Sequence, residues 1–476
     1  MQPLASPGYG YFIIAYLLLM LLIGLFLGKK ARENEGKEGF FLAGRSLPLS
    51  VLVGTLIATW FGGGGVMGGG NFTYTYGPYA AVFFYCGSPL GAIALIWLGP
   101  KIRELAKYTV PEILEHTYGP KTRLLSSICV ILAYTGIISY NFTGVAYIIN
   151  LITGYDQQIC TIVSGVVMVF LAVMAGMYSV AWTDALSAFM IAISMGIGLI
   201  FISSKAGGYA ATFTALTPAQ QSLSGGLNTL QLLSYALPTM FLYLGDQSQI
   251  QRYGAAKNPK QAKLSATILF AGMIYVNVLL ISYCFFGIKM LPGIKGDTTI
   301  FRMAIEHVPF LLGAPILCSC VAFIVTTGDS FLLSTASNIV LDIGQKYIKP
   351  DMSEKETVKW TRIVIVLVGL LSYTLAVFFP EVLSMMMLSY SIYGASVTIP
   401  LLGAFLWKKA SPAGGMASVL SGAISIFIWE IYLGRPMGVN SVIPGVICST
   451  LGLVIFSLLI PAEKKSSMET ASSEPA

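Results

Sequence analysis

Long apolar segments dominate this chain and restrict how it can fold. A segment of about 20 apolar residues crosses a bilayer as a helix, because a helix satisfies its own backbone groups inside the hydrocarbon. The sequence is 55% hydrophobic and only 10% charged over 476 residues. These features predict an all-α polytopic membrane protein and exclude a soluble globule. Thirteen spans are predicted, over residues 9–28, 47–76, 80–99, 121–152, 157–178, 181–204, 226–250, 263–288, 309–344, 358–379, 381–406, 413–433 and 440–460.

Basic residues predict the orientation of these spans. All but five of the 28 lysines and arginines fall in loops on one side or in the C-terminal tail. Cytoplasmic loops carry an excess of such residues, so the N-terminus is expected outside and the C-terminus inside a cytoplasmic membrane. The formal charge of +7 is explained by this topology, and no nucleic-acid partner is expected. The exceptions are Lys205, Lys289, Lys295, Arg302 and Arg435.

No loop is long enough for a second domain, so we expect one transmembrane domain over residues 1–460 and a short disordered tail over 461–476. The sequence has no Walker A lysine motif, which argues against ATP-driven transport. Its seven cysteines give neither a disulfide framework nor a zinc spacing.

A glycine-rich stretch interrupts the second predicted span. Seven of the nine positions from Gly62 to Gly70 are glycine, and at about 1 kcal/mol each an unbroken helix would be disfavoured by roughly 7 kcal/mol. We therefore predict a broken helix. Unwound backbone is tolerated at this depth only where protein buries it or where it lines a cavity. Such breaks expose carbonyls to cations and helix ends to solutes in many secondary transporters.

A second interruption is expected in the seventh span, at Pro238 and again at Gly245. If residues 47–204 and 226–406 are two halves of five spans each, both halves begin with an interrupted helix and enter the membrane from opposite sides. That arrangement predicts a five-plus-five inverted-repeat core with a site between the halves.

Several polar and aromatic residues near these interruptions are candidates for solute contact. Trp60 lies in mid-span, where a cavity wall and plain helix packing are equally good explanations. For Asp246, a solvated inner mouth competes with a substrate contact. The full candidate set is Trp60, Gly64, Gly65, Asn71, Tyr140, Asp246 and Gln247.

Two aspartates within spans are functional candidates because charge in a membrane is costly. Asp184 starts the sixth span, where a helix N-terminal acid stabilised by the macrodipole is an alternative. Asp329 lies past the middle of the ninth span, and the spacing of Thr326, Asp329 and Ser330 puts them near one helix face. Hydroxyl and carboxylate oxygens suit a hard monovalent cation.

Together these residues resemble the sodium:solute symporter family over roughly residues 9–410. Four motifs in the right order carry the resemblance: Ala58-Thr59-Trp60-x-Gly62-Gly63-Gly64, Tyr178-Ser179-Val180-x-Trp182-Thr183-Asp184, Gln251-Arg252, and Thr326-Thr327-Gly328-Asp329-Ser330-x-Leu332-Leu333-Ser334-Thr335-Ala336-Ser337.

The resemblance implies a sodium site between the first and eighth helices of the core. Carried over residue by residue, its ligands are the backbone carbonyls of Ala58, Phe61 and Phe323 and the hydroxyls of Thr326 and Thr327.

Some members of the family have a second cation site, which matches Asp184 here, with Asp329 and Ser330 as further candidates. The glycine-rich helix resembles the choline-transporter branch most, which cages a quaternary ammonium with tryptophans. Trp60 matches one of these, but Asp246 stands where that branch has another.

These inferences predict a sodium-coupled symporter that imports a small polar organic solute, with Na⁺ as coupling ion and the bilayer as its surroundings. Proton coupling is the nearest alternative, since an intramembrane acid can relay protons. A solute receptor without transport and an intramembrane enzyme using Asp184 and Asp329 are further alternatives, and no enzyme activity is expected. The solute remains open among amino acids, cationic amines, organic acids and sugars, as does the oligomeric state.

Overall fold

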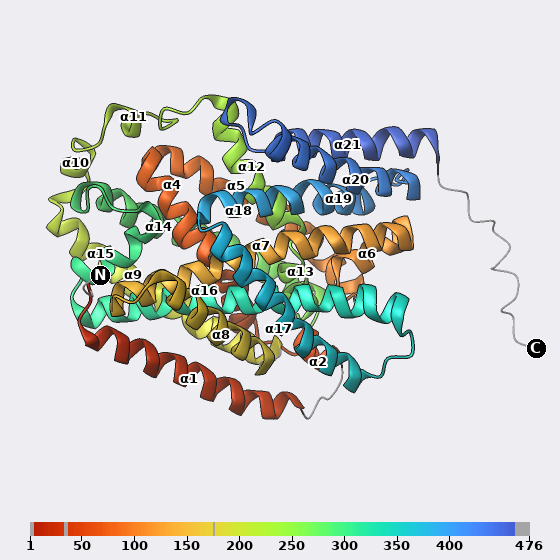
Figure 1. Cartoon of the computed structure of the whole chain (residues 1–476), viewed down its shortest axis with the longest axis horizontal. Coiled ribbons are helices and arrows are strands. Elements are labelled where there is room, and N and C mark those ends of the chain that lie inside the picture. The colour runs from red at the N-terminus through yellow and green to blue at the C-terminus, as the bar shows by residue number, and fades with distance from the viewer. Residues whose placement is uncertain (1–3, 33–36, 106, 175–176, 462–476) are drawn as a thin grey trace, which may run out of the picture.

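A computed structural model describes residues 4–32, 37–105, 107–174 and 177–461. The described residues form helices and no strand, with one isolated bridge between Leu47 and Ala256. Most long helices run along the long axis of the molecule, and α1 begins at the end opposite to that at which α21 ends (Figure 1). The unbroken long helices are α1 (Pro7–Arg32), α5 (Pro78–Leu105), α7 (Pro120–Thr153), α8 (Gln157–Met174), α9 (Met177–Lys205), α14 (Pro259–Met290), α17 (Glu354–Phe378) and α21 (Val442–Leu459).

Other spans contain π-helical turns or breaks. The first group comprises α16 (Phe310–Ser337) with η4 (Asn338–Ile348), α18 (Val382–Tyr393) with η5 (Gly394–Thr398) and α19 (Ile399–Leu406), and α20 (Pro412–Phe427) with η6 (Ile428–Tyr432). The broken helices are α3 (Leu49–Trp60) with η2 (Gly64–Gly68) and α4 (Gly69–Tyr76), and α12 (Thr229–Gly245) with α13 (Gln247–Gly254). Short helices in the connections are α2 (Lys37–Leu42), η1 (Ala43–Arg45), α6 (Val110–Tyr118), α10 (Gly208–Phe213), α11 (Pro218–Gln221), η3 (Gly296–Thr298), α15 (Thr299–Glu306) and η7 (Pro436–Gly438).

The predicted count of thirteen spans is not confirmed. Within the described ranges, ten helices are long and apolar enough to cross a membrane, or eleven if the bent pair α3 and α4 forms one span. The two remaining predictions correspond to α1 and to the 17-residue helix α12, which are both helical but are not among these ten or eleven.

The glycine-rich helix is broken, but at a more restricted place than expected. α3 ends at Trp60, and the chain bends by 53° before continuing. The prediction that the glycines themselves unwind is wrong for Gly64 to Gly70, which form η2 and the start of α4. Close packing compensates for their poor helix propensity. A Cβ on Gly69 would lie 2.1 Å from the Tyr85 hydroxyl oxygen, so no larger residue fits there.

The second broken helix differs from its prediction in a similar way. α12 continues through Pro238 without ending, so no break occurs there. It ends at Gly245, as expected, and Asp246 separates it from α13 with ψ of 113°. The Asp246 carboxylate then accepts a hydrogen bond from the Ser248 amide (3.1 Å), which caps α13.

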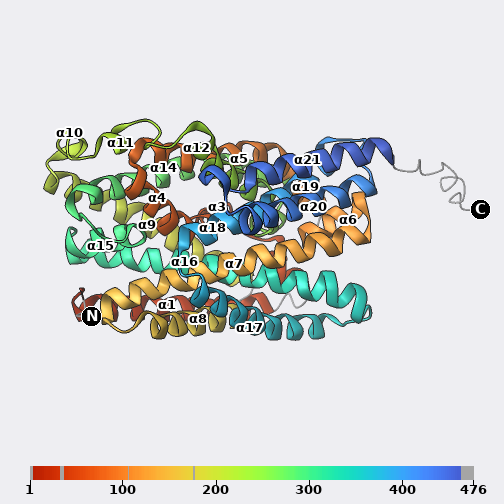
Figure 2. The ribbon, with the colours of Figure 1, turned by 45° about the horizontal axis from the view of Figure 1, so that its top comes forward.

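The two broken helices lie next to the helices that carry the candidate charges. α3 packs against α9 and α16, and α13 contacts both α3 and α16. α1 packs on α9 and α16 from outside this group. In the turned view, α16 and α7 run through the middle of the molecule, with α1, α8 and α17 along one face (Figure 2). Residues from distant parts of the chain therefore meet at the centre.

Candidate functional site

Thr327 joins the end of α3 to the middle of α16. Its hydroxyl lies 3.1 Å from the Ala58 carbonyl oxygen and 3.2 Å from that of Thr59, and it can donate to either. A Cβ on Gly62 would come within 2.5 Å of this hydroxyl oxygen, so the approach requires glycine at the bend. Backbone carbonyls at a helix end and a hydroxyl on a facing helix are the oxygens that hard cations prefer.

The other predicted sodium ligands are buried around this contact. Phe61 lies in the bend, where its amide caps α3 by donating to the Ile57 carbonyl (3.2 Å). Phe323 is fully buried one turn before Thr327 on α16. The Thr326 hydroxyl oxygen has no hydrogen-bond partner of good geometry within the described part of the chain, although it lies near the Asp184 carboxylate. Free ligand capacity is thus present at Thr326.

Arg252 forms a buried ion pair with Asp184. Its Nη2 lies 3.2 Å from Asp184 Oδ2 and donates to the Ser330 hydroxyl at 2.7 Å, and both charged side chains are fully buried. Asp184 Oδ2 also accepts from the Thr55 hydroxyl (2.5 Å). The alternative of a helix N-terminal acid is therefore wrong, because Asp184 lies about two turns into α9 and pairs with a cation. Arg252 was expected in a cytoplasmic loop, but it is buried within α13.

Asp329 has an unsatisfied oxygen close to this pair. Its side chain is 5% exposed, and Oδ1 has no hydrogen-bond partner among the residues described. Asp184 Oδ1 is unpartnered in the same sense. Asp184, Asp329 and Thr326 thus bring three oxygens without a well-aligned hydrogen bond to one buried region.

Aromatic side chains surround the bend. Trp60 packs edge-on against Tyr243 with ring centroids 4.7 Å apart, and lies 6.2 Å from Tyr390. The Tyr140 and Tyr390 hydroxyls are 3.2 Å apart, and a Cβ on Gly64 would meet both. These residues from α3, α7, α12 and α18 form one group, which is suited to an organic solute because it combines apolar faces with few polar atoms.

Gly65 and Asn71 lie further along this helix, in different surroundings. The Gly65 carbonyl accepts from the Tyr85 hydroxyl (2.7 Å). Asn71 donates to Asp297 at 3.0 Å and lies beside η3, at the same end of the molecule as α15. The structure does not bring Asn71 to the aromatic group.

Asp246 and Gln247 are fully buried, so the expectation of a solvated inner mouth is wrong. Tyr134 donates to Asp246 Oδ1 at 2.5 Å, while Oδ2 is unpartnered within the described ranges. Gln247 joins three elements: its Oε1 accepts from the Val110 amide (3.0 Å), and its Nε2 donates to the Ser334 carbonyl (3.2 Å). Gln247 therefore connects α13 to α6 and α16.

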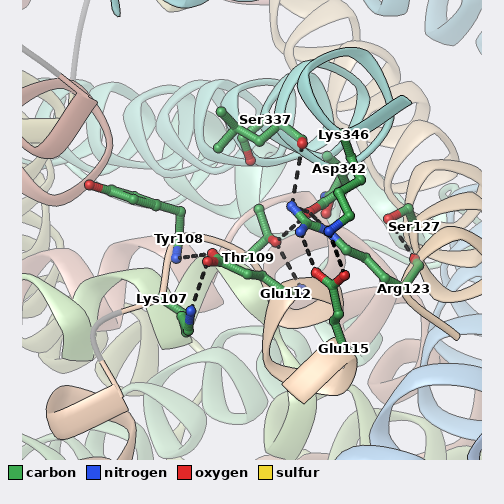
Figure 3. A network of polar contacts seen from close by, with 12 residues as sticks. Lys107, Tyr108, Thr109, Glu112, Glu115, Arg123, Ser127, Ser337, Asp342 and Lys346 are labelled. Atoms are coloured by element: carbon green, nitrogen blue, oxygen red, sulfur yellow. Dashed lines mark hydrogen bonds and ion pairs between the residues drawn. The ribbon is translucent and has the colours of Figure 1, made fainter. Parts of the chain in front are cut away.

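A polar network covers this connection on the side of the basic loops (Figure 3). Arg123 lies between Glu115 and Asp342, with nitrogen–oxygen distances of 2.5 and 2.7 Å. Lys346 also pairs with Glu115 (2.8 Å), and the Thr109 hydroxyl donates to Asp342 (2.9 Å). The network ties α6 and the start of α7 to η4.

The fold and the buried site define a polytopic membrane transporter, in which two broken helices pack against a third helix that carries hydroxyls and a carboxylate. The comparisons with known proteins make this class specific. The model of the Sodium:solute symporter family matches residues 40–422, so the chain belongs to that family. Proteins of this family are membrane symporters, hence transporters rather than enzymes.

Curated relatives and solved structures agree with this assignment. The chain is 26% identical to the high-affinity proline transporter PutP of Bacillus subtilis over 94% of this chain and 97% of the relative. It is 24% identical to the high-affinity choline transporter 1 of Drosophila melanogaster, covering 87% and 69% of the two chains. A Na⁺-coupled sialic acid symporter in a substrate-bound outward-open state has a TM-score of 0.80 at 18% identity, over 96% and 99% of the two chains. At 18% identity, the similarity to the sialic acid symporter shows that the two chains share a fold.

Some residues of the site were not singled out from the sequence. Tyr390, Tyr243 and Thr55 are ordinary residues of apolar spans, and only the packing brings them to the bend and to Arg252. Arg252 differs from these, because it belongs to the motif Gln251-Arg252, but its pairing with Asp184 could be seen only in the structure.

Proposed function

We propose that the protein is a sodium-coupled secondary-active symporter that imports a small polar organic solute by alternating access. The observation that carries the proposal is the contact of Thr327 with the Ala58 and Thr59 carbonyls at the bend of α3. Sodium in that place is bound by Ala58, Phe61, Phe323, Thr326 and Thr327, and the family membership supports the assignment.

Binding of sodium and of solute is coupled through the broken helix. An ion held between α3 and α16 fixes the bend, and the bend carries Trp60 and Gly64 of the aromatic group. Each ligand then raises the affinity of the other by the same factor, as linkage requires. The solute contacts Trp60, Tyr140 and Gly64, while Asp246 is available to a cationic group.

Orientation follows from the basic loops, with the N-terminus outside and the C-terminus inside the cytoplasmic membrane. On the basic side, the bonds of Gln247 hold α13 against α6 and α16, and the Arg123 network ties α6 to η4. Release of solute to the cytoplasm therefore requires that these bonds open.

The function is tested with the purified protein in proteoliposomes. Solute uptake from a panel of amino acids, cationic amines, organic acids and sugars is measured with an inward sodium gradient and with sodium replaced by potassium. Sodium-dependent accumulation of one unmodified solute supports symport. Binding of a solute without accumulation would instead indicate a receptor.

A second cation at Asp184, Asp329 and Ser330 is tested by stoichiometry. We expect Asp329→Asn to lower the sodium-to-solute ratio obtained from reversal potentials. The control is Asp297→Asn, because Asp297 is also buried but pairs with Asn71 away from α16. An unaltered ratio in Asp329→Asn would contradict the second site.

Proton coupling is the second candidate, favoured by the unpartnered Oδ1 of Asp329. A buried carboxylic acid without a cation partner is most stable in the protonated form. Proton coupling would be established if a pH gradient drives uptake in sodium-free medium and if this uptake is lost in Asp329→Asn.

A further inference from the structure

A cavity reaches Asp329 from the side of α1, away from the aromatic group. Its volume is ≈ 30 Å³, which is room for about one or two water molecules. Leu21 of α1, Leu171 and Met174 of α8 and Ser179 of α9 form its walls, and Thr326 and Asp329 of α16 line it as well.

The position of the wall residues along their helices shows where the cavity leads. Met174 is the last residue of α8 and is 47% exposed, and Ser179 lies in the first turn of α9. The cavity thus lies between the last turn of α8, the first turn of α9 and Asp329, which is near the middle of the 39-residue span Phe310–Ile348. The end of α8 and the start of α9 belong to the same side of the predicted topology as the basic loops.

The cavity has apolar walls near α1 and oxygens at the far end. Asp329 Oδ1 and Thr326 Oγ1 are both without partners in the described part of the chain. A buried carboxylate oxygen that lines a water-sized cavity is suited to a small cation carrying part of its water.

The central route on the same side is closed by side chains of α13. Gln251 donates to the Tyr108 carbonyl (2.9 Å) and accepts from Ser334 (3.0 Å), while Arg252 bonds Ser330. These bonds separate the aromatic group from the basic side but do not cross the cavity beside α1. An ion at Asp329 and a solute at Trp60 therefore face different exits.

We propose that the cation held by Asp184, Asp329 and Ser330 exchanges with the cytoplasm through the cavity between α1, α8 and α9, independently of the solute route past α13. The proposal rests on the second cation site described under the proposed function. It gives α1, which precedes the ten helices of the predicted repeats, a part in transport as one wall of an ion pathway.

The walls can be tested by pairs of adjacent substitutions. Leu21 lines the cavity, so Leu21→Trp places an indole in it. Leu22 does not line the cavity and is 63% exposed, so Leu22→Trp places the indole on the outer face of α1. On α8, Leu171→Trp and Phe170→Trp form a second pair of the same kind, because Phe170 is exposed. Sodium exchange is measured with radioactive sodium in proteoliposomes, and sodium affinity by thermal shift of the purified protein.

We expect Leu21→Trp and Leu171→Trp to slow sodium exchange by about tenfold, because an indole and a hydrated ion cannot share so small a cavity. Sodium affinity should stay within about twofold of the parent, since no ligand changes. Leu22→Trp and Phe170→Trp should behave as the parent does. If both members of each pair exchange sodium at equal rates, the pathway is refuted.

Water in the cavity is tested separately with Ser179→Cys, in a variant whose seven native cysteines are replaced. A charged, membrane-impermeant thiol reagent should modify it from the cytoplasmic side, more slowly with sodium present. Modification only by a lipid-soluble reagent would mean that an acyl chain fills the cavity, which contradicts the proposal. If Asp329→Asn changes the sodium-to-solute ratio but both members of each tryptophan pair exchange sodium at equal rates, the second cation site is supported and the pathway through the cavity is rejected.

Discussion

At the scale of single residues, the site depends on oxygens that the fold leaves incompletely bonded. The Thr327 hydroxyl of α16 bonds the Ala58 carbonyl of another helix, α3. The Thr335 hydroxyl instead bonds the Phe331 carbonyl of its own helix (2.7 Å). A hydroxyl that bonds its own helix serves that helix. A hydroxyl directed at a neighbouring helix end can also coordinate an ion that is held there by the carbonyls of that end.

Thr327→Ala should therefore raise the sodium concentration required for half-maximal uptake. Loss of one hydrogen-bonding group to a charge costs about 1.5–3 kcal/mol, which corresponds to roughly ten- to hundredfold. Uptake is measured over a sodium series, with Thr327→Ser and Thr335→Ala as controls expected to stay near the parent. Unchanged sodium dependence of Thr327→Ala would remove this residue from the site.

Arg252 allows a prediction about stability. Arg252→Gln leaves the buried Asp184 carboxylate without its cation, and breaking a buried pair in this way costs about 3–5 kcal/mol. We expect a clearly lowered thermal unfolding temperature in detergent. The double variant Arg252→Gln/Asp184→Asn should recover part of the loss, since no charge is left unpaired. A double variant less stable than the sum of the two single changes would show that the pair is not the cause.

At the scale of the element, neighbouring side chains and not backbone flexibility account for three glycines of η2 and α4, namely Gly64, Gly68 and Gly69. Gly68 and Gly69 pack against Met386 and Tyr85, at distances where an added Cβ would overlap. Their dihedral angles are helical. The low helix propensity of the stretch is thus outweighed by packing, which explains why propensity alone placed the break too broadly.

Gly69→Ala and Gly70→Ala separate these two effects. A Cβ at Gly69 would lie 2.1 Å from the Tyr85 hydroxyl oxygen, but at Gly70 its nearest neighbour is the Cys284 sulfur at 3.4 Å. We expect Gly69→Ala to destabilise the protein by about 1–3 kcal/mol through overpacking, and Gly70→Ala to be neutral or stabilising by up to about 1 kcal/mol. The free energy of unfolding of both variants is measured in detergent. Equal changes in the two variants would indicate that helix propensity, and not packing, dominates at Gly69.

At the scale of the whole molecule, charges on the basic side hold distant segments together. Burial by itself would raise the pKa of Glu115, but the hydrogen bonds and charges of Lys346 and Arg123 outweigh it and hold that pKa below 4.5. Glu115 belongs to α6, and Lys346 to η4. Because Gln247 of α13 bonds both Val110 of α6 and the Ser334 carbonyl of α16, a network that holds α6 to η4 also stabilises the position of α13.

Because the pKa of Glu115 is lowered in the folded protein, the stability that this network contributes depends on pH. The stabilisation from Glu115 is complete above its unfolded pKa of 4.5 and is lost as the pH falls through its lower folded value. Stability measured by thermal unfolding should therefore decrease below about pH 4.5, and the decrease should be smaller in Glu115→Gln. Glu356→Gln is an informative comparison, because Glu356 is partly exposed and pairs with Lys349 outside the network. Equal pH profiles for the parent and Glu115→Gln would exclude this role.

The sequence by itself determined the class of protein, because apolar length and the absence of charge act locally along the chain. It also placed a break near Gly62, one at Gly245 and a cluster of hydroxyl side chains around Thr326, since each is a property of neighbouring residues. Only the tertiary structure decided that Arg252 neutralises Asp184, that Asp246 is buried and that Asn71 lies elsewhere. These outcomes depend on contacts between segments far apart in sequence, and burial and charge pairing arise only when those segments pack.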